Sequence, residues 1–141
     1  MRTILVPVDG SESSARAVKA AIKAATEFGG SKLLLLTVQP PIISGNVTRF
    51  FSTDAIQDYY QDEGHNALLS AKAVLDEAGV PYTEAIEVGP VAATIANYAK
   101  NNNCDMIIMG TRGLGAVTGF VLGSVTTKVL SMVDMPVALV K

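Results

Sequence analysis

The segment Thr3-Ile4-Leu5-Val6-Pro7-Val8 is almost wholly apolar and ends abruptly at Asp9-Gly10-Ser11. A strand of this kind is typical of a parallel sheet that helices cover on both faces. Ser11 is a good N-cap for a helix over 12–28, in which small apolar residues recur at helical spacing, and Gly29-Gly30 would stop that helix. A buried strand followed at once by an amphipathic helix indicates βαβ units, with this strand in a central position.

The rest of the chain repeats the alternation of short β-rich runs and longer helical segments. We predict helices from Ser52 or Thr53 to Ala78, from Pro90 to about 101, and from Ser124 to about Met132. Further strands are predicted at Lys32–Val38, Tyr82–Val88, Cys104–Met109 and Met135–Val140. The pattern predicts an α/β fold built as one domain over residues 1–141, with a parallel sheet of five strands.

Two segments between these elements have a distinct character. Residues 39–52 contain Pro, Ser, Gly and Asn together with Phe50 and Phe51, and we predict a long loop there. Polar and apolar residues alternate in Tyr82–Val88, which favours an edge strand. In the long helix that precedes this strand we expect one apolar stripe, formed by Ile56, Tyr60, Ala67, Ala71, Val74 or Leu75, and Ala78.

Composition excludes several classes of protein. The 141 residues carry a net charge of −2 with scattered Lys and Arg, so the electrostatic footprint of a nucleic-acid binder is missing. No apolar run approaches the ~20 residues of a membrane span, and the N-terminus does not resemble a signal peptide. Cys104 is the single cysteine, which predicts a reducing, cytoplasmic location. His65 is the single histidine and is expected to be solvated, so a metal cluster or His-based triad is not predicted.

Two strand ends carry the features that could bind a ligand. One is Asp9-Gly10-Ser11, and the other is the glycine-rich run that begins at Gly110 and leads to Gly123-Ser124. In open parallel sheets, ligands bind beyond the carboxyl ends of strands where the strand order reverses. On one interpretation, a helix starting at Ser124 offers free N–H groups to a phosphate. On the other, the glycines only form a flexible connection and Ser124 is only an N-cap. Asp9 likewise is either a site residue or a turn former, and we favour the site.

Common nucleotide motifs fit poorly. A P-loop needs Gly-Lys-Ser/Thr, which does not occur in the chain. The dinucleotide fingerprint needs Gly-x-Gly-x-x-Gly early in the chain, whereas Gly113-Leu114-Gly115 lies late and lacks the third glycine.

A different nucleotide signature is present. Gly110-x2-Gly113-x9-Gly123-Ser124 resembles the Gly-x2-Gly-x9-Gly-Ser/Thr signature of the universal stress protein family. The resemblance covers nearly the whole chain except 40–66. It implies a Rossmann-like sheet of order 3-2-1-4-5, of the adenine nucleotide alpha hydrolase-like type, with ATP, ADP or AMP held between strands one and four. The residues that the resemblance assigns to nucleotide binding are Pro7, Val8, Asp9, Val38, Met109, Gly110, Arg112, Gly113, Gly123, Ser124, Val125 and Thr126.

Within this set the resemblance implies distinct roles. Asp9 would lie near the ribose or bind Mg²⁺, Val38 would meet the adenine through its backbone, and Arg112 would hold phosphate. Family members without ATP carry side chains in place of the glycines, so retained Gly110, Gly113 and Gly123 place this chain with the binding branch. Gly115 and Gly119 are additional glycines that we expect to tune affinity.

The expected function is that of an ATP-binding stress-response or signalling module with slow or no hydrolysis. The alternatives are a slow ATPase or related nucleotide-dependent enzyme, and a phosphate-accepting receiver. An enzyme is disfavoured because no general base is evident, and a receiver because the third strand ends in Glu87-Val88-Gly89 without an acceptor Asp. We also expect a homodimer through the terminal strand and a protein partner that the sequence does not identify, with 40–66 as the segment that would define it.

Overall fold

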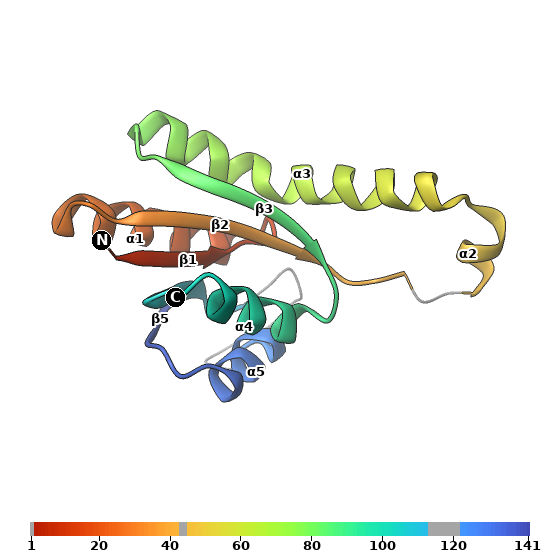
Figure 1. Cartoon of the computed structure of the whole chain (residues 1–141). Helices are drawn as coiled ribbons and strands as arrows, with labels where there is room; N and C mark the ends of the chain where they lie inside the picture. The colour runs from red at the N-terminus through yellow and green to blue at the C-terminus, as the bar shows by residue number, and fades with distance from the viewer. Residues whose placement is uncertain (1, 43–44, 113–121) are drawn as a thin grey trace.

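A parallel sheet of five strands forms the centre of the protein. The computed structural model describes residues 2–42, 45–112 and 122–141. The strand order is β3-β2-β1-β4-β5, which confirms the predicted order 3-2-1-4-5 (Figure 1). The strands are β1 (Thr3–Pro7), β2 (Lys32–Gln39), β3 (Tyr82–Val88), β4 (Met106–Gly110) and β5 (Val137–Val140).

The central position of β1 follows from its pairing with two neighbours. Leu5 lies opposite Leu34 on β2 and opposite Ile107 on β4, and both pairings are parallel. All three side chains are almost fully buried, as expected for strands covered on both faces. The strand order reverses between β1 and β4. A receiver has the order 2-1-3-4-5, so the topology contradicts that alternative.

Helices cover both faces of the sheet. The helices α1 (Glu12–Phe28) and α3 (Thr53–Ala78) pack on one face, and α4 (Val91–Asn101) and α5 (Ser124–Met132) pack on the other (Figure 1). Successive strand side chains point to opposite faces. Ile4 and Val6 therefore join the cluster under α1 and α3, whereas Leu5 joins the cluster under α4 and α5.

The turn between β1 and α1 is built as its sequence predicts. The Ser11 hydroxyl caps α1 by accepting a hydrogen bond from the Ser14 amide at 3.1 Å. Gly10 has a φ of +86°, a conformation that residues with a Cβ rarely adopt. The Asp9 side chain closes the turn, because its Oδ1 accepts a hydrogen bond from the Ser11 amide at 2.9 Å.

The predicted long loop after β2 is wrong in part. Residues Gly45–Phe50 form a short helix, α2, and Phe51 donates its amide to the Val47 carbonyl at 3.0 Å. The glycine, asparagine and serine content of the segment favours a loop, but helix propensity is a weak guide that the context of the fold overrides here. Together α2 and the start of α3 extend away from the sheet (Figure 1).

Two details of the helices also differ from prediction. On α3 the buried positions are Tyr60, Gly64, Leu68, Ala71 and Leu75, so Gly64 and Leu68 were missed and Ala78 is exposed. Gly64 is buried because α3 approaches β3 closely there: a Cβ at Gly64 would lie 2.5 Å from Cγ2 of Ile86. Pro90 is the N-cap of α4 rather than its first residue.

Within the described residues, none of the helices has the length and apolar character that crossing a membrane requires.

Candidate functional site

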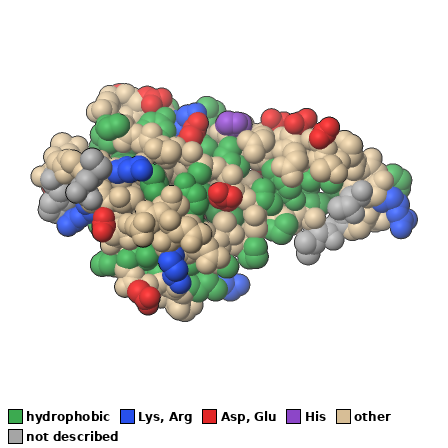
Figure 2. All heavy atoms as spheres, viewed as in Figure 1, with side chains coloured by type: hydrophobic (Ala, Val, Ile, Leu, Met, Phe, Trp, Pro, Cys, Tyr) green, Lys and Arg blue, Asp and Glu red, His purple; other side chains and the backbone are tan. Residues whose placement is uncertain are grey.

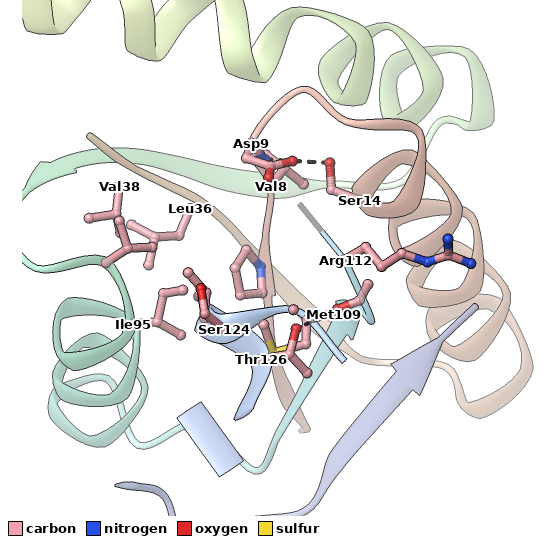
Figure 3. A pocket seen from close by; sticks show the side chains of 15 residues that line it. Val8, Asp9, Ser14, Leu36, Val38, Ile95, Met109, Arg112, Ser124 and Thr126 are labelled. Atoms are coloured by element: carbon pink, nitrogen blue, oxygen red, sulfur yellow. Dashed lines mark hydrogen bonds between the residues drawn. The ribbon is translucent and has the colours of Figure 1, made fainter. Parts of the chain in front are cut away.

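A cavity lies where the strand order reverses. It has a volume of about 300 Å³ and opens at the carboxyl ends of β1 and β4, beside the first turn of α5 (Figure 3). Its walls are Pro7, Val8, Asp9, Ser14, Leu36, Val38, Val91, Ile95, Met109, Gly110, Arg112, Gly123, Ser124, Val125 and Thr126. This is the position at which open α/β sheets bind ligands.

Every residue that the family resemblance assigned to a nucleotide site lies in this wall except Gly113. Gly113 falls outside the described residues, as do Gly115 and Gly119. Sequence reasoning missed Ser14, Leu36, Val91 and Ile95. Leu36 could have been predicted from strand periodicity, because it precedes Val38 by two residues and therefore lies on the same face of β2. The other three required knowledge of how α1 and α4 approach the sheet.

One end of the cavity is apolar. Leu36 and Val38 approach it from β2, and Val91 and Ile95 from the first turns of α4 (Figure 3). None of these four side chains can form a hydrogen bond, so this end suits a flat apolar group whose polar edge would be met only by backbone.

Another part of the cavity wall is polar and includes the start of α5. Gly123 is the N-cap of this helix and has no side chain to cap it, so among the described residues no N-cap side chain satisfies the amide groups of the first turn. Ser124 is the first helical residue rather than the N-cap, and it is exposed at the cavity wall. Amides and a hydroxyl at the positive end of a helix favour an anion.

Hydrogen bonds hold the start of α5 against the end of β4. The Gly123 amide donates to the Thr111 carbonyl at 2.7 Å, and the buried Thr126 hydroxyl donates to the Gly110 carbonyl at 3.1 Å. The Thr111 amide in turn donates to the Val140 carbonyl on β5 at 3.1 Å. The start of α5 is therefore fixed to the sheet by backbone hydrogen bonds and by the Thr126 hydroxyl.

Asp9 serves the local turn and also borders the cavity. Its Oδ1 accepts the Ser11 amide, and its own amide donates weakly to the Ser14 hydroxyl at 3.4 Å (Figure 3). The two interpretations of Asp9 are thus compatible. Among the described residues, no group of three or more His, Cys, Asp or Glu side chains could hold a metal ion. A metal at Asp9 would need most of its ligands from elsewhere.

Gly110 has a packing role that its place in the nucleotide signature does not indicate. A Cβ at this position would lie 2.8 Å from the carbonyl oxygen of Ser13 in the first turn of α1. The Arg112 amide also donates to the Ser13 hydroxyl, at 3.3 Å. The absence of a side chain at Gly110 is therefore explained by close contact of helix and strand.

Arg112 borders the cavity, but its guanidinium points away from Asp9, Ser124 and Thr126 (Figure 3). The described wall residues that carry hydroxyl groups are Ser14, Ser124 and Thr126.

The remaining residues considered from sequence lie away from the cavity. His65 is exposed on α3, in agreement with its expected solvation. Cys104 is buried, and burial, followed by the charge of Asp105, raises the pKa of its thiol. A raised pKa keeps the thiol protonated and poorly nucleophilic.

Together, the doubly wound sheet and the cavity at the point where its strand order reverses define an α/β protein of the Rossmann-like type. The sequence profile of the Universal stress protein family matches residues 1–141. A universal stress protein of Thermus aquaticus is 34% identical over 146 residues, covering 99% of this chain and 98% of that protein. Universal stress protein MJ0531 of Methanocaldococcus jannaschii is 33% identical over 141 residues, covering 99% and 82%. The chain belongs to the universal stress protein family.

Solved structures agree with this assignment. The hypothetical protein MJ0577 superposes with a TM-score of 0.84 at 28% identity, covering 99% of this chain and 95% of that chain. A universal stress protein solved in complex with cAMP superposes with a TM-score of 0.73 at 28% identity, covering 99% and 97%.

Proposed function

We propose that the cavity binds an adenine nucleotide, with ATP as the leading candidate, and that the protein acts as a nucleotide-regulated stress-response or signalling module. The observation that carries the proposal is the pairing of an apolar end with the open first turn of α5 in one cavity. A nucleotide has the same two parts, a flat base and an anionic phosphate. The similarity to a relative solved with cAMP supports the same class of ligand.

In this proposal the base lies between Val38 and Ile95, and the backbone of Val38 meets its polar edge. The ribose lies against Met109, Pro7 and Val8. The phosphates accept hydrogen bonds from the amides of Ser124, Val125 and Thr126 and from the Ser124 hydroxyl. Arg112 and Gly113 complete the phosphate site, and for Arg112 this requires a rotation of its side chain toward the cavity.

Mg²⁺ would accompany the phosphates of ATP. Asp9 would be its protein ligand, because its carboxylate borders the cavity and carboxylate oxygens suit this ion. Phosphate oxygens and water would supply the other ligands, since Mg²⁺ is commonly held by one or two carboxylates and substrate phosphates. Asp9 is the one carboxylate in the described cavity wall, and this proposal assigns it to Mg²⁺; since no His, Glu or Lys lies in that wall, no second group is left to act as a general base, and we expect hydrolysis slower than about 1 s⁻¹.

The proposal is tested by thermal unfolding of the purified protein with ATP, ADP, AMP and cAMP in turn. At 100 times its dissociation constant, a ligand adds about 2.7 kcal/mol to the free energy of unfolding. We expect ATP to raise the melting temperature in wild type and to raise it less in Ser124→Ala. Ser131→Ala is the matched control, because Ser131 is an exposed serine at the other end of α5. No shift with any of the four nucleotides would refute the proposal.

The terminal strand supports a second part of the proposal. β5 forms the edge of the sheet, its residues are only partly buried, and unpaired edges tend to pair. We propose a homodimer through β5, in a cytoplasmic protein with one domain over residues 1–141. Sedimentation at micromolar concentration should give twice the mass of the chain, and a monomer mass would contradict the dimer.

A further inference from the structure

An arm projects from the sheet and is not explained by the nucleotide site. It consists of residues 45–63, which are α2 and the first turns of α3, and it extends beyond the sheet (Figure 1). α3 has 26 residues and is therefore about 39 Å long. From Thr53 to Tyr59 no residue is buried, whereas the part of α3 after Tyr60 packs on β2 and β3.

The arm is a built feature with an anchored base. Ser52 caps α3 by accepting the Ala55 amide at 3.1 Å. Tyr60 is 6% exposed, and its hydroxyl accepts the Ile42 amide at 2.7 Å, which ties α3 to the chain leaving β2. Tyr59 and Tyr60 have ring centroids 6.0 Å apart, a distance at which tilted aromatic rings attract.

Large aromatic side chains on the arm are left in solvent. Phe50 is 76% exposed, Phe51 58% and Tyr59 50%. Burying Phe and Tyr side chains is favourable, and both residue types are enriched in protein interfaces. Three of them within ten residues on a projecting element indicate a contact surface.

The same arm concentrates negative charge. Asp54, Asp58 and Asp62 are exposed at intervals of four residues, so they form one stripe along α3, and Glu63 adjoins it. Acidic side chains gather along the outer edge of this helix, above hydrophobic ones (Figure 2). Against these four acids the arm has one base, Arg49, giving −3, while the whole chain is −2, so the remainder is +1.

We propose that the arm binds a basic, amphipathic helix of another protein, with Phe50, Phe51 and Tyr59 holding its apolar side and the Asp stripe pairing with its Lys or Arg residues. Helix recognition by an apolar surface with complementary charge is a recurring mode of peptide binding. An anionic membrane would be repelled by the stripe. A symmetric contact of two arms through the Asp stripe would bring two acidic surfaces together.

The test uses a synthetic peptide of about 18 residues with Leu and Lys at helical spacing, and a control peptide with Glu in place of Lys. We expect the Lys peptide to bind with a micromolar dissociation constant and the Glu peptide to be inert. Phe50→Ser/Phe51→Ser should weaken binding at least about 30-fold, as loss of an aromatic anchor does. Leu69→Ser is the matched control, because Leu69 is 68% exposed on α3 beyond the arm.

Charge is tested separately. Asp54→Asn/Asp58→Asn/Asp62→Asn should weaken binding about tenfold in low salt and flatten its salt dependence. Glu27→Gln/Glu77→Gln/Asp134→Asn removes equal charge from exposed sites elsewhere and should leave binding unchanged.

Two results would overturn the proposal. One is equal binding of the Lys peptide and the Glu peptide, and the other is wild-type affinity for the Lys peptide in Phe50→Ser/Phe51→Ser. Binding of wild type to phosphatidylserine vesicles would indicate a membrane surface instead. A fall from dimer to monomer in the double variant would indicate a second copy.

Discussion

Gly110 and Ser13 lie so close that a Cβ on the glycine would be 2.8 Å from the serine carbonyl oxygen. This contact joins the last residue of β4 to the first turn of α1, on the side of the cavity where Asp9 and Ser14 lie. The nucleotide signature and the packing of α1 on the sheet therefore share one residue. A side chain at Gly110 would therefore disturb the packing of α1 against β4 whether or not a ligand is bound.

Gly110→Ala should lower the free energy of unfolding by about 1–3 kcal/mol, because the helix backbone must move to admit a methyl group. Urea unfolding measures this loss. Gly45→Ala is the control, since a Cβ at Gly45 would meet no atom within 4 Å. If Gly110→Ala is as stable as Gly45→Ala, the packing explanation of Gly110 is wrong.

Tyr60→Phe should loosen the base of the arm. It removes the acceptor of the Ile42 amide and costs about 1 kcal/mol, the usual net contribution of such a bond. Hydrogen exchange of the Ile42 amide and of the amides at 45–59 should become faster, while exchange within β1 stays slow. Tyr59→Phe is the matched control, because it removes a hydroxyl from a neighbouring tyrosine that is half exposed. Equal exchange rates in the Tyr60→Phe and Tyr59→Phe variants would contradict an anchoring role for the Tyr60 hydroxyl.

Stability should fall at alkaline pH, and Cys104 should contribute to the fall. Burial raises the pKa of its thiol above the ordinary 9.0. Once the pH exceeds 9.0, the unfolded chain loses this proton while the folded chain keeps it, so ionisation favours unfolding. Burial and the charge of Glu87 likewise raise the pKa of Tyr98 above 10.0.

Urea midpoints measured from neutral pH upward should therefore decline more steeply in wild type than in Cys104→Ala. Tyr98 is unchanged in Cys104→Ala, so the urea midpoint of that variant should still decline with rising pH, but less than the midpoint of wild type. Parallel curves for the two proteins would show that the thiol does not ionise on unfolding.

Strand positions could be predicted from sequence because their causes are local. Continuous apolar runs such as Leu33–Leu36 identify strands buried on both faces, and Ser11 and Gly29 fix the ends of α1 by capping. The strand order did not follow from these patterns alone; it came with the family resemblance.

What sequence reasoning missed depends on contacts between distant elements. Gly64 is buried because α3 crosses β3 at Ile86, and Ser14 enters the cavity wall because α1 begins beside β4. Neither position has a local signal. α2 was missed because Gly45, Asn46 and Thr48 are poor helix formers, and a helix of six residues has too few positions to show periodicity.

The most direct test of the account is calorimetric titration of ATP with Mg²⁺ into wild type and into Gly123→Val. Gly123 has φ −63° and ψ 155°, which valine adopts readily, so the fold should remain intact while the side chain obstructs the first turn of α5. Circular dichroism verifies that both proteins are folded. We predict binding with one site per chain in wild type and none in folded Gly123→Val. Equal affinity in the two proteins would contradict a phosphate site at the start of α5.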